Sequence, residues 1–151
     1  MSNALLIALC SISMLSSGDF QSQDEAFFIF LNQWKALFEQ NDPELIAEQV
    51  QFPLREAQVA VGRYGQGGLT KEEFITHFDR IFADFLPLLK NANNAQVRKL
   101  DKGHEAYKAP SDAMIYQLSL TINDEEGEST LAFLFWKVDG QYKLRYLIFA
   151  G

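Results

Sequence analysis

The chain has few of the residues that build covalent or metal-bound frameworks. Its 151 residues include one cysteine, Cys10, and two histidines, His77 and His104. A single cysteine cannot form an internal disulfide, and it cannot supply a cysteine-based zinc site. Two histidines far apart in the sequence are too few for a recognisable set of metal ligands. We therefore expect no metal and no other cofactor.

Positive charge is also scarce. The chain has 13 Lys and Arg residues against 20 Asp and Glu residues, which gives a net charge of −7 at pH 7. Proteins that bind nucleic acid need clusters of Lys and Arg to replace the counterions of the phosphates, so nucleic acid is not an expected partner. The acidic residues are spread along the chain apart from one run at residues 124–128, which we interpret as a solvated turn.

The chain lacks the long apolar run that a membrane span requires. Residues 4–15 are mostly apolar, but a run of about twelve residues is too short for a transmembrane helix. Small residues follow at 16–18, as in a signal-peptidase site, although no Lys or Arg precedes the run. Residues 1–18 are therefore predicted to be a signal peptide or N-terminal apolar segment, and the protein to be periplasmic or secreted. The alternatives are a lipoprotein box ending at Cys10, or an ordinary N-terminal helix and a cytoplasmic location.

Phenylalanine, by contrast, is abundant, with 13 residues, and much of it recurs at helical spacing. Apolar residues between 27 and 38 follow the i, i+3, i+4, i+7 pattern of one buried helix face, behind a capping box at residues 22–25. A second capping box, at residues 70–73, precedes another Phe-rich face. These patterns predict helices over residues 23–40 and 70–90. A short helix between them should begin at Asp42 and Pro43, a good N-cap followed by a good first helical residue.

The remainder of the chain has the patterns of β-strands. Alternation of apolar and polar side chains predicts strands at residues 55–64, 96–102, 113–122, 129–138 and 141–150. The last two flank Asp139-Gly140, a strong type I′ turn signal because both turn positions need positive φ. We predict a single α+β domain over residues 19–151. Three N-terminal helices, with a strand between the second and the third, should pack on a curved, mostly antiparallel sheet.

The C-terminal hairpin allows its register to be predicted. A two-residue loop places Trp136 opposite Lys143 and, further along, Phe133 opposite Tyr146. The face with Phe133 and Tyr146 is apolar and should face the helices. The other face is mixed in character, and its members include Trp136, Lys143 and Arg145. This composition is typical of a subunit interface, so we predict a homodimer through that face; a partly exposed face with snorkelling side chains is the alternative.

The order of elements and the end of the chain resemble the nuclear transport factor 2-like superfamily, a cone-shaped α+β fold shared with ketosteroid isomerases and polyketide cyclases. Its members often end in a hairpin of the form aromatic-x-x-x-Asp-Gly-x-aromatic-x-hydrophobic. The matching residues are Trp136, Asp139, Gly140, Tyr142 and Leu144. Segments 38–55 and 71–82 look like one bacterial branch of the superfamily. The resemblance covers roughly residues 23–150 and implies a pocket between the helices and the concave sheet face. It specifies no reaction, because one fold hosts many functions.

Candidates for lining the implied pocket are Trp34, Arg55, Tyr116 and Tyr146. Arg55 could address an anionic ligand, or could pair with the neighbouring Glu56. An isomerase-type enzyme needs a general base and a donor for the developing oxyanion. Tyr116 or Tyr146 could be that donor and Asp112 the base. The alternative is that both tyrosines are core residues and Asp112 is a turn residue.

His77 is a further catalytic candidate, because a relay with Asp84 is conceivable on the third helix. A boundary histidine with a local hydrogen bond is the alternative. The residue sets of the superfamily's known enzymes cannot be placed on this sequence. We therefore expect a non-catalytic domain that binds a small apolar ligand or a protein partner. The alternative is an isomerase, dehydratase or cyclase that uses a pocket Tyr/Asp or His/Asp pair.

Overall fold

The computed structural model describes residues 19–57 and 68–150, with side chains at residues 24–55 and 68–150. The chain forms two structural units, residues 1–33 and 34–151, and each is described by itself. The described part of the first unit belongs to helix α2 (Asp19–Glu39), which begins before the predicted start near residue 23 and continues into the second unit. None of the helices within the described residues is long and apolar enough to cross a membrane. The predicted signal peptide lies outside the described residues.

The remaining helices are short and belong to the second unit. They are α3 (Pro43–Ala47), α4 (Lys71–Thr76), α5 (Phe78–Phe82), α6 (Leu86–Asn91) and the single 3₁₀ turn η1 (Asn94–Gln96). The capping box at residues 70–73 is confirmed, with both reciprocal hydrogen bonds present. The prediction of one helix over residues 70–90 is wrong, because the helix is interrupted at His77 and again after Phe82. Pro87, in the first turn of α6, explains the second break, since a proline inside a helix removes a hydrogen bond and clashes with the preceding turn.

Five strands form one sheet, in the order β1-β5-β4-β3-β2. Their bounds are β1 (Val50–Ala57), β2 (Val97–Leu100), β3 (Ile115–Asp124), β4 (Gly127–Val138) and β5 (Gln141–Ala150). Strand β1 runs parallel to β5, and the other three pairs are antiparallel. The α+β class and the curved, mostly antiparallel sheet are therefore confirmed. The first strand was predicted too late, at residues 55–64; β1 begins at Val50, and residues 58–67 lie outside the described part.

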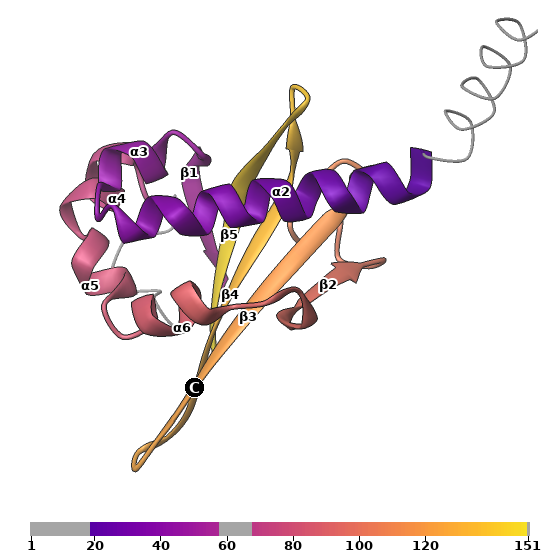
Figure 1. The fold of residues 1–151 in the computed structure, drawn as a ribbon. Coiled ribbons are helices and arrows are strands. Elements are labelled where there is room, and N and C mark those ends of the chain that lie inside the picture. Colours follow the sequence, from indigo (N-terminus) through magenta and orange to yellow (C-terminus); the bar gives the residue numbers. More distant parts are fainter. Residues whose placement is uncertain (1–18, 58–67, 151) are drawn as a thin grey trace, which may run out of the picture. The chain divides into compact units, whose positions relative to one another are not determined.

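The short helices of the second unit lie to one side of the sheet (Figure 1). Aromatic side chains pack between these helices and the sheet. Phe133 of β4 stacks on Phe82 of α5, with ring centroids 6.0 Å apart. Trp34, in the part of α2 that belongs to this unit, makes edge contacts with Phe133 at 5.3 Å and with Phe135 at 5.0 Å. These four side chains are each at most 2% exposed. This helix-side face is thus a packed aromatic core.

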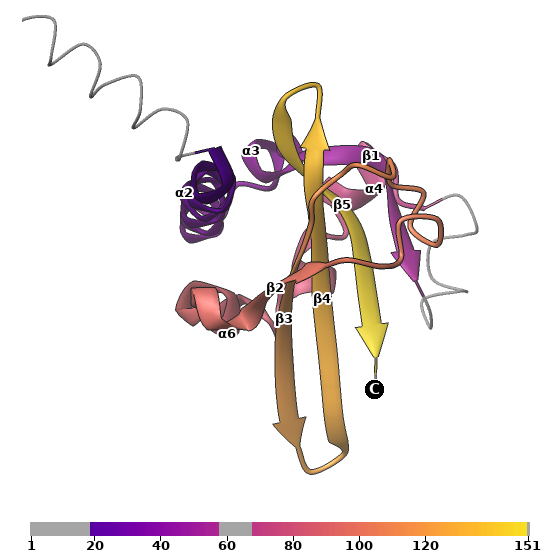
Figure 2. The same cartoon turned by 90° about the vertical axis from the view of Figure 1, so that its right-hand side faces the viewer.

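The opposite face of the sheet is covered in part by the chain itself. The segment that follows β2, residues 101–114, crosses in front of the sheet toward β1 (Figure 2). Its side chains Tyr107, Ala109 and Ala113 pack on a buried cluster that includes Trp136. We call residues 101–114 the covering segment. Trp136 is 2% exposed within the single chain, so little of its surface is left for a partner to bury.

The register of the C-terminal hairpin is only partly as predicted. Trp136 pairs with Lys143, as expected, and Phe135 pairs with Leu144. Beyond these rungs the prediction is wrong, because Tyr146 pairs with Leu134 and leaves Arg145 without a partner on β4. An extra residue of this kind is a β-bulge, and it moves every later side chain to the other face. Tyr146 therefore lies on the face of Trp136 and not on the helix side.

Candidate functional site

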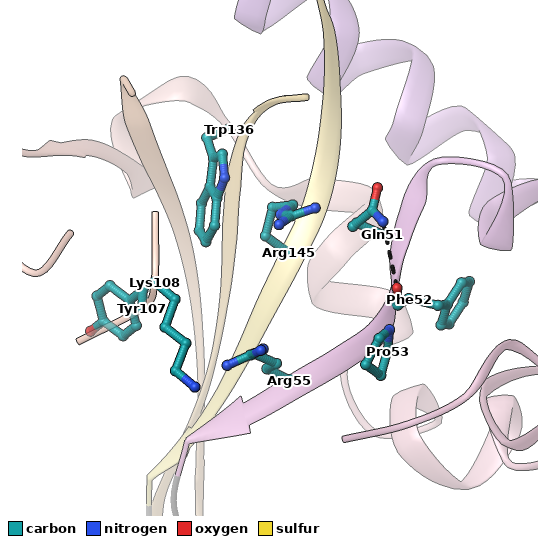
Figure 3. Close-up of a pocket in the computed structure, with 8 residues that line it drawn as sticks. All are labelled: Gln51, Phe52, Pro53, Arg55, Tyr107, Lys108, Trp136 and Arg145. Carbon is teal, nitrogen blue, oxygen red and sulfur yellow. Dashed lines mark hydrogen bonds between the residues drawn. The ribbon is translucent and has the colours of Figure 1, made fainter. Parts of the chain in front are cut away.

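A pocket of about 130 Å³ lies on the sheet face that the covering segment overlies (Figure 3). Its lining comes from β1, β4, β5 and the covering segment. The lining residues are Gln51, Phe52, Pro53, Arg55, Tyr107, Lys108, Trp136 and Arg145. We call this the cationic pocket, because three of its described lining residues are Lys or Arg and none of them is Asp or Glu.

Two irregularities in neighbouring strands create the cationic pocket. On β5 the bulge at Arg145 turns that side chain into it. On β1 the pairing with β5 is interrupted between Val50, which is opposite Leu144, and Arg55, which is opposite Tyr146. Three residues of that interval, Gln51, Phe52 and Pro53, have no partner on β5 and line the pocket. Bulges commonly re-aim side chains next to functional sites, and here two irregular stretches face each other.

The covering segment supplies the third wall and is held by its own hydrogen bonds. Within it, the Tyr107 N–H donates to the carbonyl of Gly103 at 2.9 Å, and the Ala109 N–H donates to the carbonyl of His104 at 2.8 Å. His104 also bonds through Nε2 to the carbonyl of Ala113, at 2.8 Å. These bonds fix the backbone that carries Tyr107 and Lys108 to the pocket. The Tyr107 ring then packs edge-on against Tyr146, with centroids 5.2 Å apart.

The path of the covering segment requires a glycine at position 103. Replacing Gly103 therefore tests how this wall of the pocket is packed. The φ of Gly103 is +96°, and a Cβ there would lie 2.8 Å from the Tyr107 ring. We expect Gly103→Ala to lower the free energy of unfolding by about 2–3 kcal/mol, from backbone strain and ring displacement together. Gly140→Ala is the matched control, because Gly140 has φ +79° but nothing within 4 Å. Urea unfolding of both variants measures the two losses of unfolding free energy. Equal losses would show that crowding of the Tyr107 ring adds nothing to the backbone strain.

The electrostatics of the pocket are set by three positive charges. No hydrogen bond or ion pair links Arg55, Lys108 or Arg145 to an acidic side chain among the described residues. The Arg145 guanidinium lies over the Trp136 ring, 5.1 Å from its centroid. Burial lowers the pKa of Arg145 below its usual value, and the nearby charge of Arg55 lowers it further.

Arg145 also has an enclosed donor that is not satisfied. Its Nε is buried and has no hydrogen-bond partner among the described residues. A buried donor without an acceptor costs about 1–3 kcal/mol. Repulsion from Arg55 also disfavours the charged guanidinium of Arg145 at this position. Its contact with the Trp136 ring favours it. Arg145 is therefore held at a cost to stability, as is frequent for side chains retained at functional sites.

The chemistry that suits these groups is the recognition of an anion. A guanidinium offers donors in a planar fork that matches carboxylate and phosphate oxygens, and charge-assisted hydrogen bonds of this kind are stronger than neutral ones. The amide of Gln51, which donates weakly to its neighbour's carbonyl at 3.5 Å, is a further polar group on the wall. Within the described residues, no group of three His, Cys, Asp or Glu side chains is placed to hold a metal ion.

The structure divides the predicted pocket residues between two faces of the sheet. Arg55 lines the cationic pocket, and Tyr146 packs behind its wall against Tyr107. Trp34 and Tyr116 lie on the helix side, where Tyr116 is 1% exposed and makes an edge contact with Tyr142 at 5.9 Å. The predicted pocket residues are therefore not brought together in one cavity.

The predicted dimer face supplies part of the pocket. Trp136 and Arg145 line it, and they had been chosen for a subunit interface. Lys143 instead donates from Nζ to the carbonyl of Glu48, at the end of α3. The homodimer stays a prediction.

The candidate catalytic residues lie on different elements. Asp112 is exposed, in the covering segment, whose Ala113 packs on the face opposite Tyr116. His77 is half-buried at the junction of α4 and α5, and Asp84 is exposed beyond α5. No hydrogen bond between Asp112 and Tyr116, or between His77 and Asp84, is among the contacts described.

Sequence reasoning missed Tyr107 and Lys108. Segment 101–114 has neither helical nor strand periodicity, so its path over the sheet could not be predicted. The signal that was available is local. Gly103 favours a turn near the start of the segment. The φ of +55° at Lys108 is uncommon for a residue other than glycine, and no sequence signal predicts it.

Comparison with known proteins adds one structural similarity. No protein-family model matches the chain, and no curated protein matches it in sequence. A solved structure from Xanthomonas campestris, assigned provisionally as a calcium/calmodulin-dependent protein kinase II association domain, aligns with 83% of this chain and 84% of that chain. The sequence identity is 16% and the TM-score is 0.43. A similarity of this size says nothing about function.

Proposed function

We propose that this protein is a small binding domain whose cationic pocket holds a small anionic ligand. The single observation that carries the proposal is the convergence of Arg55, Lys108 and Arg145 on one pocket without an acidic partner among the described residues. Three like charges gathered without compensation are unfavourable, so an anion is the partner that they suit. No reaction is part of the proposal.

The chemistry of the pocket changes the expected ligand. An apolar ligand was expected in the space between the helices and the sheet. That space is filled by rings such as Phe82, Phe133 and Trp34, whereas the cavity on the other face is lined largely by charged and polar groups. The proposed ligand is accordingly anionic, which is one of the two roles that the sequence leaves open for Arg55.

The wider predictions also stand as proposals. We infer that the chain is a nuclear transport factor 2-like domain, which the order of its elements and the Asp139-Gly140 hairpin motif support. Export by way of residues 1–18 and assembly into a homodimer are proposed on the sequence arguments alone.

Anion binding can be tested by titrating the ¹⁵N-labelled protein with succinate at constant ionic strength. We expect the indole N–H signal of Trp136, which lines the pocket, to shift in a saturable manner with a dissociation constant of about 1 mM or lower. The indole signal of Trp34 is the internal control, because that ring is packed on the helix side. Constant ionic strength is needed because added salt alone screens exposed charges.

The same titration of Arg55→Gln supplies a second control. Arg55 is exposed and makes no described ion pair, so its loss should leave the fold intact and weaken the shift of Trp136. Equal shifts of both indole signals, or no saturation in the unsubstituted protein, would contradict the proposal.

A further inference from the structure

The number of charges in the cationic pocket carries an inference about the class of ligand. Arg55, Lys108 and Arg145 together provide three positive charges, and no described acidic residue lines the cavity. A ligand with one negative charge would leave most of this charge uncompensated beside a partly desolvated guanidinium. We infer that the pocket selects small dianions, either a short dicarboxylate or a phosphate monoester, over monoanions of the same shape. This inference rests on the proposed anion-binding function.

The directions from which the charges arrive support a ligand with two negative charges. Arg145 comes from the bulge of β5 and lies over Trp136. Arg55 comes from β1 and Lys108 from the covering segment, and both extend into the pocket away from Trp136 (Figure 3). One part of a ligand can therefore meet Arg145 while another meets the pair. A guanidinium at each position offers its fork of donors to oxygen pairs, whether these belong to two carboxylates or to one phosphate.

The size of the cavity restricts the ligand further. At about 130 Å³, it is smaller than the roughly 300–1,000 Å³ of pockets that hold drug-sized molecules. The Trp136 face next to the cavity is already occupied by Arg145, so it is not free to stack a second ring on that side. The ligand, or the part of it that enters, therefore consists of a few heavy atoms and its two charges.

Two matched pairs of probes separate charge from shape. Succinate is compared with its monoamide, succinamate, and methyl phosphate with dimethyl phosphate, at about pH 7.5, where a phosphate monoester is mostly doubly charged. Binding is measured by calorimetry and by the indole shift of Trp136, at constant ionic strength. We expect the doubly charged member of at least one pair to bind at least tenfold more tightly, a difference of about 1.4 kcal/mol. The pair that shows the preference identifies the dicarboxylate or the phosphate as the source of the charge.

Variants test whether the preference for dianions depends on the second group of charges, Arg55 and Lys108. Arg55→Gln should reduce the preference to about threefold or less, because Lys108 alone then meets the second negative group, without the donor fork of a guanidinium. Lys137→Gln is the matched control: Lys137 is exposed, lies over the Tyr142 ring at 5.1 Å and does not line the pocket. It should leave the preference unchanged.

The outcomes separate the inference from the proposed function. If both members of each pair bind with similar affinity, the pocket binds anions and the inference of a dianion is wrong. If none of the four probes binds, the proposed function fails, and the inference fails with it. If Lys137→Gln lowers the preference as much as Arg55→Gln does, the effect arises from overall charge and not from the pocket, which also overturns the inference.

Discussion

Replacing Phe133 by Ala should lower the free energy of unfolding by about 3–5 kcal/mol, because the ring is at the centre of the helix-side core. Phe133 is 0% exposed, stacks on Phe82 at 6.0 Å and receives the edge of Trp34 at 5.3 Å. Removing the ring loses its transfer free energy and leaves a cavity that rigid neighbours cannot close. Urea or thermal unfolding measures the change.

The size of this loss is a large share of the stability of an ordinary domain, so a milder variant that stays folded is tested beside Phe133→Ala. Phe133→Leu keeps most of the apolar volume and should cost about 1–2 kcal/mol. The folded Phe133→Leu protein should still bind succinate as the unsubstituted protein does. A loss below 1 kcal/mol for Phe133→Ala would show that the helix side is loosely filled and has room for a ligand. A loss of succinate binding in Phe133→Leu would contradict the proposed site, because it would place the ligand on the helix side of the sheet.

The packing around Phe133 decides between the two places where a ligand could sit. The family resemblance of the sequence implies a pocket between helices and sheet. Here Phe82, Trp34 and Phe135 occupy that space, and the described cavity is on the opposite face. A substrate pocket around Tyr116 would need these rings to move. The candidate ligand site therefore lies at the irregular stretch between β1 and β5 and not between the helices and the sheet.

The architecture could be predicted because each element has a repeating pattern of its own. The spacing of Phe74, Phe78 and Phe82 indicates a buried helical face, and the alternation in residues 141–150 indicates a strand. The breaks in the helix after residue 70 were missed for a different reason. The apolar pattern continues through His77 and through Pro87, and tertiary packing lets three short helices keep one common apolar face.

The candidate site could be predicted only in fragments, because it is made by departures from regular pairing. The sequence leaves Arg55 as either an anion ligand or a partner of Glu56, and it puts Arg145 on a mixed face that was predicted to be a subunit interface. Nothing in the local sequence marks the bulge at Arg145, since the strand alternates regularly through it. The irregularity at residues 51–54 of β1 depends likewise on pairing with a strand some ninety residues away. Register slips of this kind are set by tertiary contacts.

Replacing Arg145 by Met should weaken succinate binding by at least tenfold while it raises the free energy of unfolding by about 0.5–1 kcal/mol. Binding falls because the charge and the donor fork at the Trp136 end of the pocket are lost. Stability rises because the substitution removes a buried Nε without an acceptor and the repulsion from Arg55. The lost contact with Trp136, worth about 0.5–1 kcal/mol, offsets part of this gain. Calorimetry and urea unfolding of one protein preparation measure both effects.

Lys137→Met is the matched control, because it removes another cation that lies over an aromatic ring, at the same distance of 5.1 Å. Lys137 is exposed and outside the pocket, so neither binding nor stability should change by much. Opposite signs for binding and stability in Arg145→Met would identify Arg145 as a residue kept for a ligand. A stability loss above 1 kcal/mol would instead make Arg145 a structural residue that anchors the bulge through Trp136. Loss of stability together with unchanged binding would remove Arg145 from the site altogether.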